Sequence, residues 1–165
     1  TDWSGYGKAL PKVNNLNTKK ILILGYGGAA KAIHYFFISK NVKNIDIANR
    51  SKKRIKFIKK IKYSKNYKGI NKQISSANII INTTPNNPLT KTQIKLVKKS
   101  TIVSDIVYNP RNTAFLNQFP SNKKVYGISM LLHQAIPCFK IWFGFNPSVD
   151  KKLLQILNKK ISWQK

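Results

Sequence analysis

The sequence predicts an α/β fold in which helices cover both faces of a doubly wound parallel β-sheet. Short apolar runs alternate along the chain with segments whose apolar residues recur at helical spacing. The first run, Lys20–Leu24, is followed at once by Gly25, which is typical of a strand buried on both faces. A glycine-rich turn then joins this run to the first helical segment, as the β-α-β units of a parallel sheet require.

The other elements follow in a regular order. Ile33 and Phe37 give the first helical segment an apolar side, and Ile55 and Ile58 begin a three-residue spacing in a lysine-rich segment. The predicted strands are 20–24, 44–48, 77–82, 101–107 and 123–126. The predicted helices between them are 29–39, 52–62, 92–99 and 113–118. Strands that alternate with helices in this way predict a parallel sheet.

The C-terminal third contains two further helical patterns. Residues 129–143 are strongly apolar and include Pro137, which predicts a kink or a break in the helix. Residues 148–160 are amphipathic, with Leu153 and Leu157 on one stripe and lysines elsewhere.

The charge of the chain is strongly positive. It has 31 lysines and arginines against 4 acidic residues, a formal net charge of +27. This balance favours nucleic acid as a partner. However, only Arg50, Arg54 and Arg111 are arginines, the lysines are scattered, and lysine, asparagine and isoleucine all have A/T-rich codons. We therefore favour nucleotide bias of the genome over a dedicated nucleic-acid surface, and we expect no specific nucleic-acid partner.

A few features of the sequence indicate the cellular compartment and whether a metal is bound. The single cysteine, Cys138, forms no internal disulfide, and no cysteine and histidine cluster has metal-ligand spacing, so we expect a reducing compartment and no metal. No run of 18 apolar residues and no secretory leader is present, which predicts a cytoplasmic protein without membrane partners. The chain begins with Thr1 and not with methionine, which favours a cut or processed end.

The turn after the first strand predicts a dinucleotide site. It reads Gly25-Tyr26-Gly27-Gly28-Ala29-Ala30 and opens the first helix. Gly25 permits a tight turn, Gly27 lets a pyrophosphate approach the backbone, and the small Ala30 lets helix and strand pack closely. The unpaired N–H groups at the helix N-terminus then favour an anion, and the predicted fold is Rossmann-like.

The second strand ends in residues that favour NADP over NAD. NAD-preferring enzymes place an acidic side chain here, about 20 residues past the turn, for the ribose hydroxyls. This chain has Asn49, Arg50 and Ser51 there, with Arg54 one turn into the next segment. Two guanidinium groups and a hydroxyl suit a 2′-phosphate and stacking on adenine.

At this point the chain resembles the shikimate dehydrogenase family over nearly its whole length. The resemblance rests on six motifs in the family's order, which Phe139, Trp142 and Gly144 extend. The motifs are Thr1-Asp2 with Gly5, Gly25 to Ala30, Asn49-Arg50-Ser51 with Arg54, Ile81 to Pro85, Ser104 to Pro110 with Thr113, and Gly127 to Leu132 with Gln134.

The resemblance implies NADPH-dependent, reversible reduction of 3-dehydroshikimate to shikimate, in a cleft between a substrate domain and an NADP domain. It implies that Asp2 is the aspartate of a lysine–aspartate acid/base pair, because a carboxylate can orient and tune a proton-donating ammonium. The implied substrate contacts are Asp2, Tyr108 and Gln134. The implied cofactor contacts are Gly25, Gly27, Gly28, Ala29, Asn49, Arg50, Ser51, Arg54, Thr83, Thr84, Gly127 and Met130.

The resemblance also divides the chain. Residues 1–19 are expected to be an interdomain segment with the aspartate motif, 20–128 the NADP-binding domain, and 129–165 helices that pack back toward a substrate domain. That domain and its lysine have no counterpart here, so we expect NADP binding with little turnover, as a monomer or a dimer. A stand-alone NADP-binding module and a quinate/shikimate dehydrogenase are the alternatives. After Pro85 the family's glycine is replaced by Asn86-Asn87-Pro88, so the loop beside the cofactor is altered.

Overall fold

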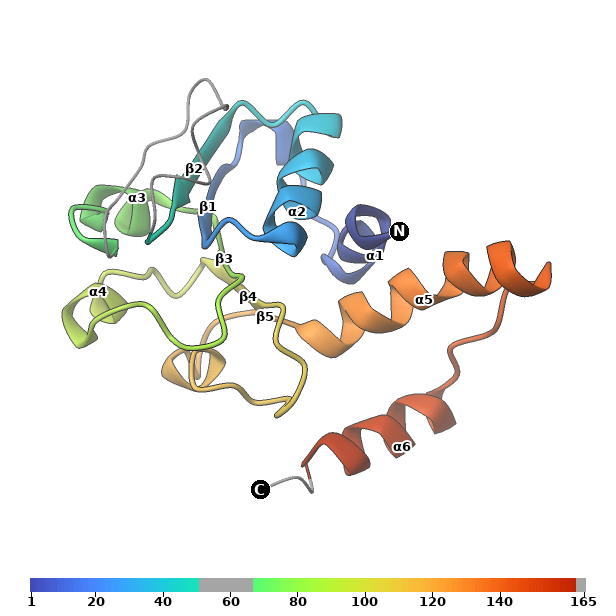
Figure 1. Ribbon diagram of the computed structural model, residues 1–165. Coiled ribbons are helices and arrows are strands. Elements are labelled where there is room, and N and C mark those ends of the chain that lie inside the picture. Colours follow the sequence, from blue (N-terminus) through green and yellow to red (C-terminus); the bar gives the residue numbers. More distant parts are fainter. Residues whose placement is uncertain (51–66, 163–165) are drawn as a thin grey trace.

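The computed structural model describes residues 1–50 and 67–162, and within them the predicted fold class is confirmed. A five-stranded sheet has the order β2-β1-β3-β4-β5, and every neighbouring pair is parallel. The strands are β1 (Lys20–Leu24), β2 (Asn44–Ala48), β3 (Ile79–Asn82), β4 (Ile102–Asp105) and β5 (Lys124–Tyr126). The helices are α1 (Asp2–Ala9), α2 (Gly28–Ser39), α3 (Asn71–Ser76), α4 (Lys91–Lys95), α5 (Gly127–Phe143) and α6 (Lys151–Ser162), with 3₁₀ turns at Leu16–Thr18 and Leu116–Gln118 (Figure 1).

Helices cover both faces of this sheet, which explains why its strands are apolar at consecutive positions. Ile21 and Ile23 of β1 belong to one core cluster, with Tyr6 of α1 and Phe37 of α2. The alternate residues of the same strand face a second cluster, which contains Ile74 of α3 and the aromatic residues around Leu116–Gln118. Because successive side chains of a strand point to opposite faces, a strand between two helical layers has no polar face.

Most element boundaries lie within a few residues of the prediction. The strands predicted at 77–82, 101–107 and 123–126 are shorter in the structure, and the helix predicted at 92–99 is α4, Lys91–Lys95. Thr90 starts α4 with a capping box, in which its hydroxyl accepts from the Gln93 backbone and the Gln93 side chain accepts from the Thr90 backbone. The segment 113–118 contains a short 3₁₀ turn, where an α-helix was expected. The predicted helix 52–62 lies outside the described residues.

Two helices, α1 and α3, were not predicted from the sequence. α1 contains Gly5 and Gly7, which lower helix propensity. Both are required by close packing: a Cβ on Gly5 would lie 2.7 Å from the Gln134 Cβ of α5, and a Cβ on Gly7 would lie 2.5 Å from the Phe36 ring of α2. α1 is therefore stabilised by its contacts with α2 and α5 more than by its own sequence.

Of the two outcomes predicted at Pro137, a kink or a break, the structure excludes the break. α5 runs as one α-helix from Gly127 to Phe143 and ends at Gly144, whose φ is +77°. The carboxylate of Asp150 caps α6 by accepting a hydrogen bond from the Leu153 backbone at 2.7 Å. Figure 1 shows α5 extending away from the sheet and α6 following it. Within the described residues, none of the helices has both the length and the apolar character that crossing a membrane requires.

Candidate functional site

An open pocket of about 410 Å³ lies at the carboxyl edge of the sheet, where β1, β2 and β3 end. After β1 the chain crosses to β2 on one side and then to β3 on the other, so the direction of winding reverses at β1. Ligands of open α/β sheets bind at such a switch point, because the loops diverge there. The described residues that line the pocket are Gly25, Tyr26, Gly27, Asn49, Arg50, Tyr67, Thr83, Thr84, Pro85, Asn86 and Pro88.

The glycine turn has different requirements at its successive positions. Gly25 has a φ of +96°, and a Cβ there would lie 2.5 Å from the Thr83 hydroxyl oxygen, so conformation and packing both require glycine. Gly27 and Gly28 have no described atom within 4 Å of a built Cβ, and neither has a positive φ. Among the described residues, no packing contact requires glycine at these two positions, although Gly27 is the N-cap of α2, where glycine is favoured over alanine. The open space would admit an anion at the N-terminus of α2. Ala29 follows in the first turn, and Ala30 is fully buried against the core.

Tyr26 lies between Gly25 and Gly27 and contacts His34 of α2. Its side chain is 4% exposed, and its hydroxyl lies 3.0 Å from Nδ1 of His34. The rings pack edge to face at 5.9 Å. Burial lowers the pKa of His34 and raises the pKa of Tyr26, so the pair is neutral near neutral pH. The hydrogen bond ties the turn to the second turn of α2.

The end of β2 places Asn49 and Arg50, two of the predicted cofactor contacts, in the pocket wall. Asn49 is buried and Arg50 is exposed. Ser51 and Arg54, the other two predicted cofactor contacts in this region, lie outside the described residues. Tyr67 lines the same pocket, and burial raises the pKa of its phenol while the Arg50 charge opposes that rise. A positive charge therefore stands beside an aromatic ring at this end of the pocket.

The loop after β3 forms the opposite wall. Thr83 donates its hydroxyl to the Leu24 carbonyl oxygen at 2.8 Å. The Thr84 hydroxyl has one proton to donate and lies 2.7 Å from each of two acceptors, the Asn82 Oδ1 and the Asn86 carbonyl oxygen. Both hydroxyl protons are therefore engaged within the protein, so toward a ligand these two hydroxyl oxygens can act only as acceptors. The loop that departs from the family's pattern, with Asn86 and Pro88, lines the pocket directly.

A buried polar cluster joins this loop to the next one. Asp105, at the end of β4, is 2% exposed. Its carboxylate accepts hydrogen bonds from Thr113 Oγ1 at 2.6 Å, Val107 N at 3.0 Å and Asn82 Nδ2 at 3.3 Å. Burial raises the pKa of Asp105, and these three hydrogen bonds limit the rise. The cluster fixes the ends of β3 and β4 relative to each other.

A second open pocket, of about 400 Å³, adjoins the first. It shares the wall formed by Thr83, Thr84 and Pro85 and continues past Tyr108, which is exposed. The two pockets form one groove along the carboxyl edge of the sheet, with Arg50 toward one end and Tyr108 toward the other. Such a groove suits an elongated ligand whose anionic part lies at the glycine turn.

The predicted substrate contacts Asp2 and Gln134 come from α1 and α5, which pack together. Gly5, one turn after Asp2, allows this contact, because a Cβ there would lie 2.8 Å from the Gln134 backbone nitrogen and 2.9 Å from the Met130 carbonyl oxygen. The structure thus brings the first turn of α1 beside Gln134, although 132 positions separate Asp2 from Gln134 in the chain. Neither residue is among those that line the two pockets.

Gly127 and Met130 have reasons for their identity inside the chain. A Cβ on Gly127 would overlap the Ile106 carbonyl oxygen and lie 2.6 Å from the Val107 carbonyl oxygen, so the start of α5 packs directly on the loop after β4. Met130 is 6% exposed and belongs to the core cluster that contains Tyr6 and Val125. Neither is among the residues that line the two pockets, and their predicted contacts with the cofactor stay predictions.

Sequence reasoning missed Tyr67 and the roles of Asn82 and Asp105. Tyr67 stands in a stretch of lysine and asparagine without periodicity, so nothing local distinguishes it. Asn82 and Asp105 each end an apolar strand, and a polar residue at the ends of two neighbouring parallel strands is a signal that could have paired them.

The comparisons with known proteins agree with this geometry. A sequence profile described as shikimate / quinate 5-dehydrogenase matches residues 8–131. Shikimate dehydrogenase (NADP(+)) of Methanothermobacter thermautotrophicus is 33% identical, and the alignment covers 96% of this chain and 63% of that relative. The crystal structure of shikimate dehydrogenase from Aquifex aeolicus has a TM-score of 0.76 at 28% identity, over 99% of this chain and 60% of its own.

A further solved structure shares the fold. Quinate dehydrogenase from Corynebacterium glutamicum, in complex with NAD, has a TM-score of 0.77 at 21% identity, over 96% of this chain and 60% of its own. The present chain therefore spans less than two thirds of the length of these relatives. The matched profile runs from α1 through the whole sheet into α5 and includes the glycine turn and the loops of both pockets. The chain belongs to the shikimate / quinate 5-dehydrogenase family.

Proposed function

We propose that this chain is the cofactor-binding part of an NADP-dependent shikimate dehydrogenase, which reduces 3-dehydroshikimate reversibly to shikimate. The observation that carries the proposal is the pocket at the switch point of the sheet, where the glycine turn, Arg50 and the Thr83-Thr84 loop meet. The names of the relatives support the reaction, and the open space beside Gly27 and Gly28 supports a phosphate-bearing cofactor.

The preference for NADP is argued from charge. None of the described residues that line the pocket is acidic, and Arg50 stands at the end of β2, where NAD-preferring enzymes place a carboxylate. A guanidinium can bind a 2′-phosphate with two hydrogen bonds, and this pairing is stronger than one between neutral groups. NADP is thus the favoured cofactor, with the 2′-phosphate beside Arg50 and the pyrophosphate at the N-terminus of α2.

A bound NADPH would supply the hydride for reduction of the carbonyl group, and residues of this chain would contact the substrate. The contact between α1 and α5 sets Asp2 and Gln134 in one region, where Gln134 would bind substrate hydroxyls and Asp2 would orient the proton donor. The family resemblance assigns that donor to a lysine with no counterpart in this chain. Without it we expect binding of NADP(H) with little turnover of 3-dehydroshikimate.

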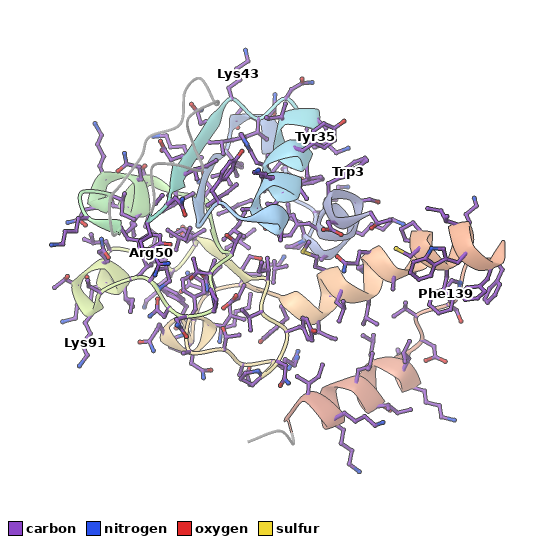
Figure 2. The ribbon with its side chains drawn as sticks, in the orientation of Figure 1. Trp3, Tyr35, Lys43, Arg50, Lys91 and Phe139 are labelled. Carbon is purple, nitrogen blue, oxygen red and sulfur yellow. The ribbon has the colours of Figure 1, made fainter. Side chains whose placement is uncertain are left out.

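The first test compares the affinities of the full chain for NADP and NAD by calorimetry, at two salt concentrations. We expect NADP to bind at least about tenfold more tightly than NAD, and Arg50→Ala to remove that preference. Lys43→Ala is the matched control, because Lys43 precedes β2 and Arg50 follows it, so the same charge is removed at the other end of the strand (Figure 2).

Three results would contradict the proposal. In the first, the chain binds neither dinucleotide, and in the second it binds both equally. In the third, the chain by itself reduces 3-dehydroshikimate at the rate of an intact two-domain enzyme. Tight binding of a specific nucleic acid in place of a dinucleotide would support the alternative that the net charge of +27 suggested. Against that alternative, the lysines are scattered along the sequence, and Lys43 and Lys91 lie at different ends of the molecule (Figure 2).

A further inference from the structure

Tyr67 is an aromatic residue in the wall of the pocket at the carboxyl edge of the sheet, and neither phosphate binding at the glycine turn nor charge pairing with arginine accounts for it. It lines the pocket together with Gly27 and Arg50. Its ring is only partly buried, and it packs against the core cluster that contains Ile70 and Ile74. One side of the ring therefore rests on a rigid apolar surface, while the side chain still borders the pocket.

The backbone of Tyr67 is held in an unfavourable conformation. Its φ is +59°, in the left-handed region that bulky residues rarely adopt. Its carbonyl oxygen accepts a hydrogen bond from Gln93 Nε2 at 2.8 Å, and Gln93 is 6% exposed and fixed by its capping box with Thr90. Surrounding contacts thus keep Tyr67 at a positive φ that glycine or asparagine would adopt with less backbone strain. Strained backbone of this kind recurs at ligand sites.

Arg50 is the charged neighbour of this ring. Its positive charge lowers the pKa that burial of the Tyr67 phenol raises, so the two side chains are close enough to interact electrostatically. A planar, electron-rich ring and a planar cation on one pocket wall form a surface on which an aromatic base can stack.

We propose that Tyr67 is the stacking platform for the adenine ring of the dinucleotide, beside the Arg50 guanidinium that holds the 2′-phosphate. The inference rests on the proposed function and adds a residue to its site. Adenine is common to NADP and NAD, so stacking on Tyr67 contributes equally to both affinities, whereas Arg50 sets the ratio between them. The two residues therefore have separable effects.

The test measures the affinity of the full chain for NADP, NAD and adenosine 2′,5′-bisphosphate in Tyr67 variants. Tyr67→Ala should weaken all three by about tenfold and leave the NADP to NAD ratio unchanged, whereas Arg50→Ala changes the ratio. Tyr67→Phe should bind within about twofold of the unmodified chain, because the ring is kept. Tyr35→Ala is the control: Tyr35 is an exposed tyrosine that packs edge to face on Trp3, and Figure 2 shows this pair well apart from Arg50.

Tyr67→Asn separates binding from folding, since asparagine tolerates a positive φ. We expect its Tm to match or exceed that of the unmodified chain while its affinity falls as in Tyr67→Ala.

The proposal is overturned if Tyr67→Ala and Tyr67→Asn bind NADP as the unmodified chain does, or if Tyr67→Phe loses as much affinity as Tyr67→Ala. If the unmodified chain binds no dinucleotide, the proposed function fails and this inference fails with it. If it binds and only the Tyr67 results disagree, the proposed function stands.

Discussion

Two glycines of the glycine turn, Gly25 and Gly27, are required for different reasons. At Gly25 the positive φ and the contact of a Cβ with Thr83 are properties of the chain itself. At Gly27 the φ is −86° and the space around a Cβ is open among the described residues, so the requirement points to a ligand. The same residue type is thus structural at one position and attributed to binding two positions later.

This difference leads to a prediction for two alanine variants. Gly25→Ala should lower the free energy of unfolding by about 2 kcal/mol, because it combines a strained φ with overlap, and it should also weaken NADP binding. Gly27→Ala should cost no more than about 1 kcal/mol, the usual preference of an N-cap position for glycine over alanine, yet weaken NADP binding at least as much. Denaturant unfolding and calorimetry measure the two quantities. Unchanged NADP binding in Gly27→Ala would show that the turn is only structural.

At the scale of elements, α1 shows how packing can reverse an intrinsic preference. Glycine to alanine in a helix normally stabilises it by about 0.5–1 kcal/mol. In α1, however, Gly5 is the point at which the helix touches α5, with the Gln134 Cβ, the Gln134 nitrogen and the Met130 carbonyl oxygen all within 3 Å of a built Cβ. The contact joins the helix that carries Asp2 to the helix that carries Gln134.

We therefore expect Gly5→Ala to destabilise the protein by about 1–3 kcal/mol, because an added methyl group forces the two helices apart. Gly28→Ala is the matched comparison: it also adds a methyl group to a helix, in the first turn of α2, but into open space. That variant should keep or raise the Tm. Equal effects of the two substitutions on Tm would contradict a tight contact between α1 and α5.

The whole molecule combines a high net charge with an exposed aromatic surface. Side chains on the C-terminal half of α5 and just beyond it are largely exposed; they are Phe139, Ile141, Trp142, Phe143 and Phe145. Exposed apolar clusters mark surfaces that contact other chains or segments. The chain spans 63% of the length of its Methanothermobacter relative, and we propose that this surface contacts a further domain of the whole protein.

The two properties act in opposite directions in solution. The net charge of +27 keeps copies of the chain apart, whereas the aromatic surface favours association. At 0.1 M salt, the repulsion between exposed charges that are more than about 10 Å apart is largely screened. We therefore expect the weight-average mass to rise from low to high salt. Sedimentation equilibrium measures this mass, and Trp142→Ser with Phe143→Ser should suppress the rise. A mass that is independent of salt in the unmodified chain would contradict this prediction.

The sequence by itself determined the order of the five strands along the chain, the glycine turn and the place of Arg50 after the second strand. These features depend on local pattern: a strand covered on both faces is apolar at consecutive positions, and a tight strand-to-helix turn needs glycine at Gly25. The six motifs that carried the family resemblance are also local, and the comparisons confirmed the family.

Only the tertiary structure decided the features that depend on residues far apart in the chain. α1 forms despite two glycines because α2 and α5 pack on it, and α5 continues through Pro137. Asp105 accepts hydrogen bonds from Asn82 and Thr113, and the carbonyl oxygen of Tyr67 accepts one from Gln93. Contacts of this kind leave no periodicity in the sequence, because each partner is chosen by the three-dimensional packing and not by its neighbours in the chain.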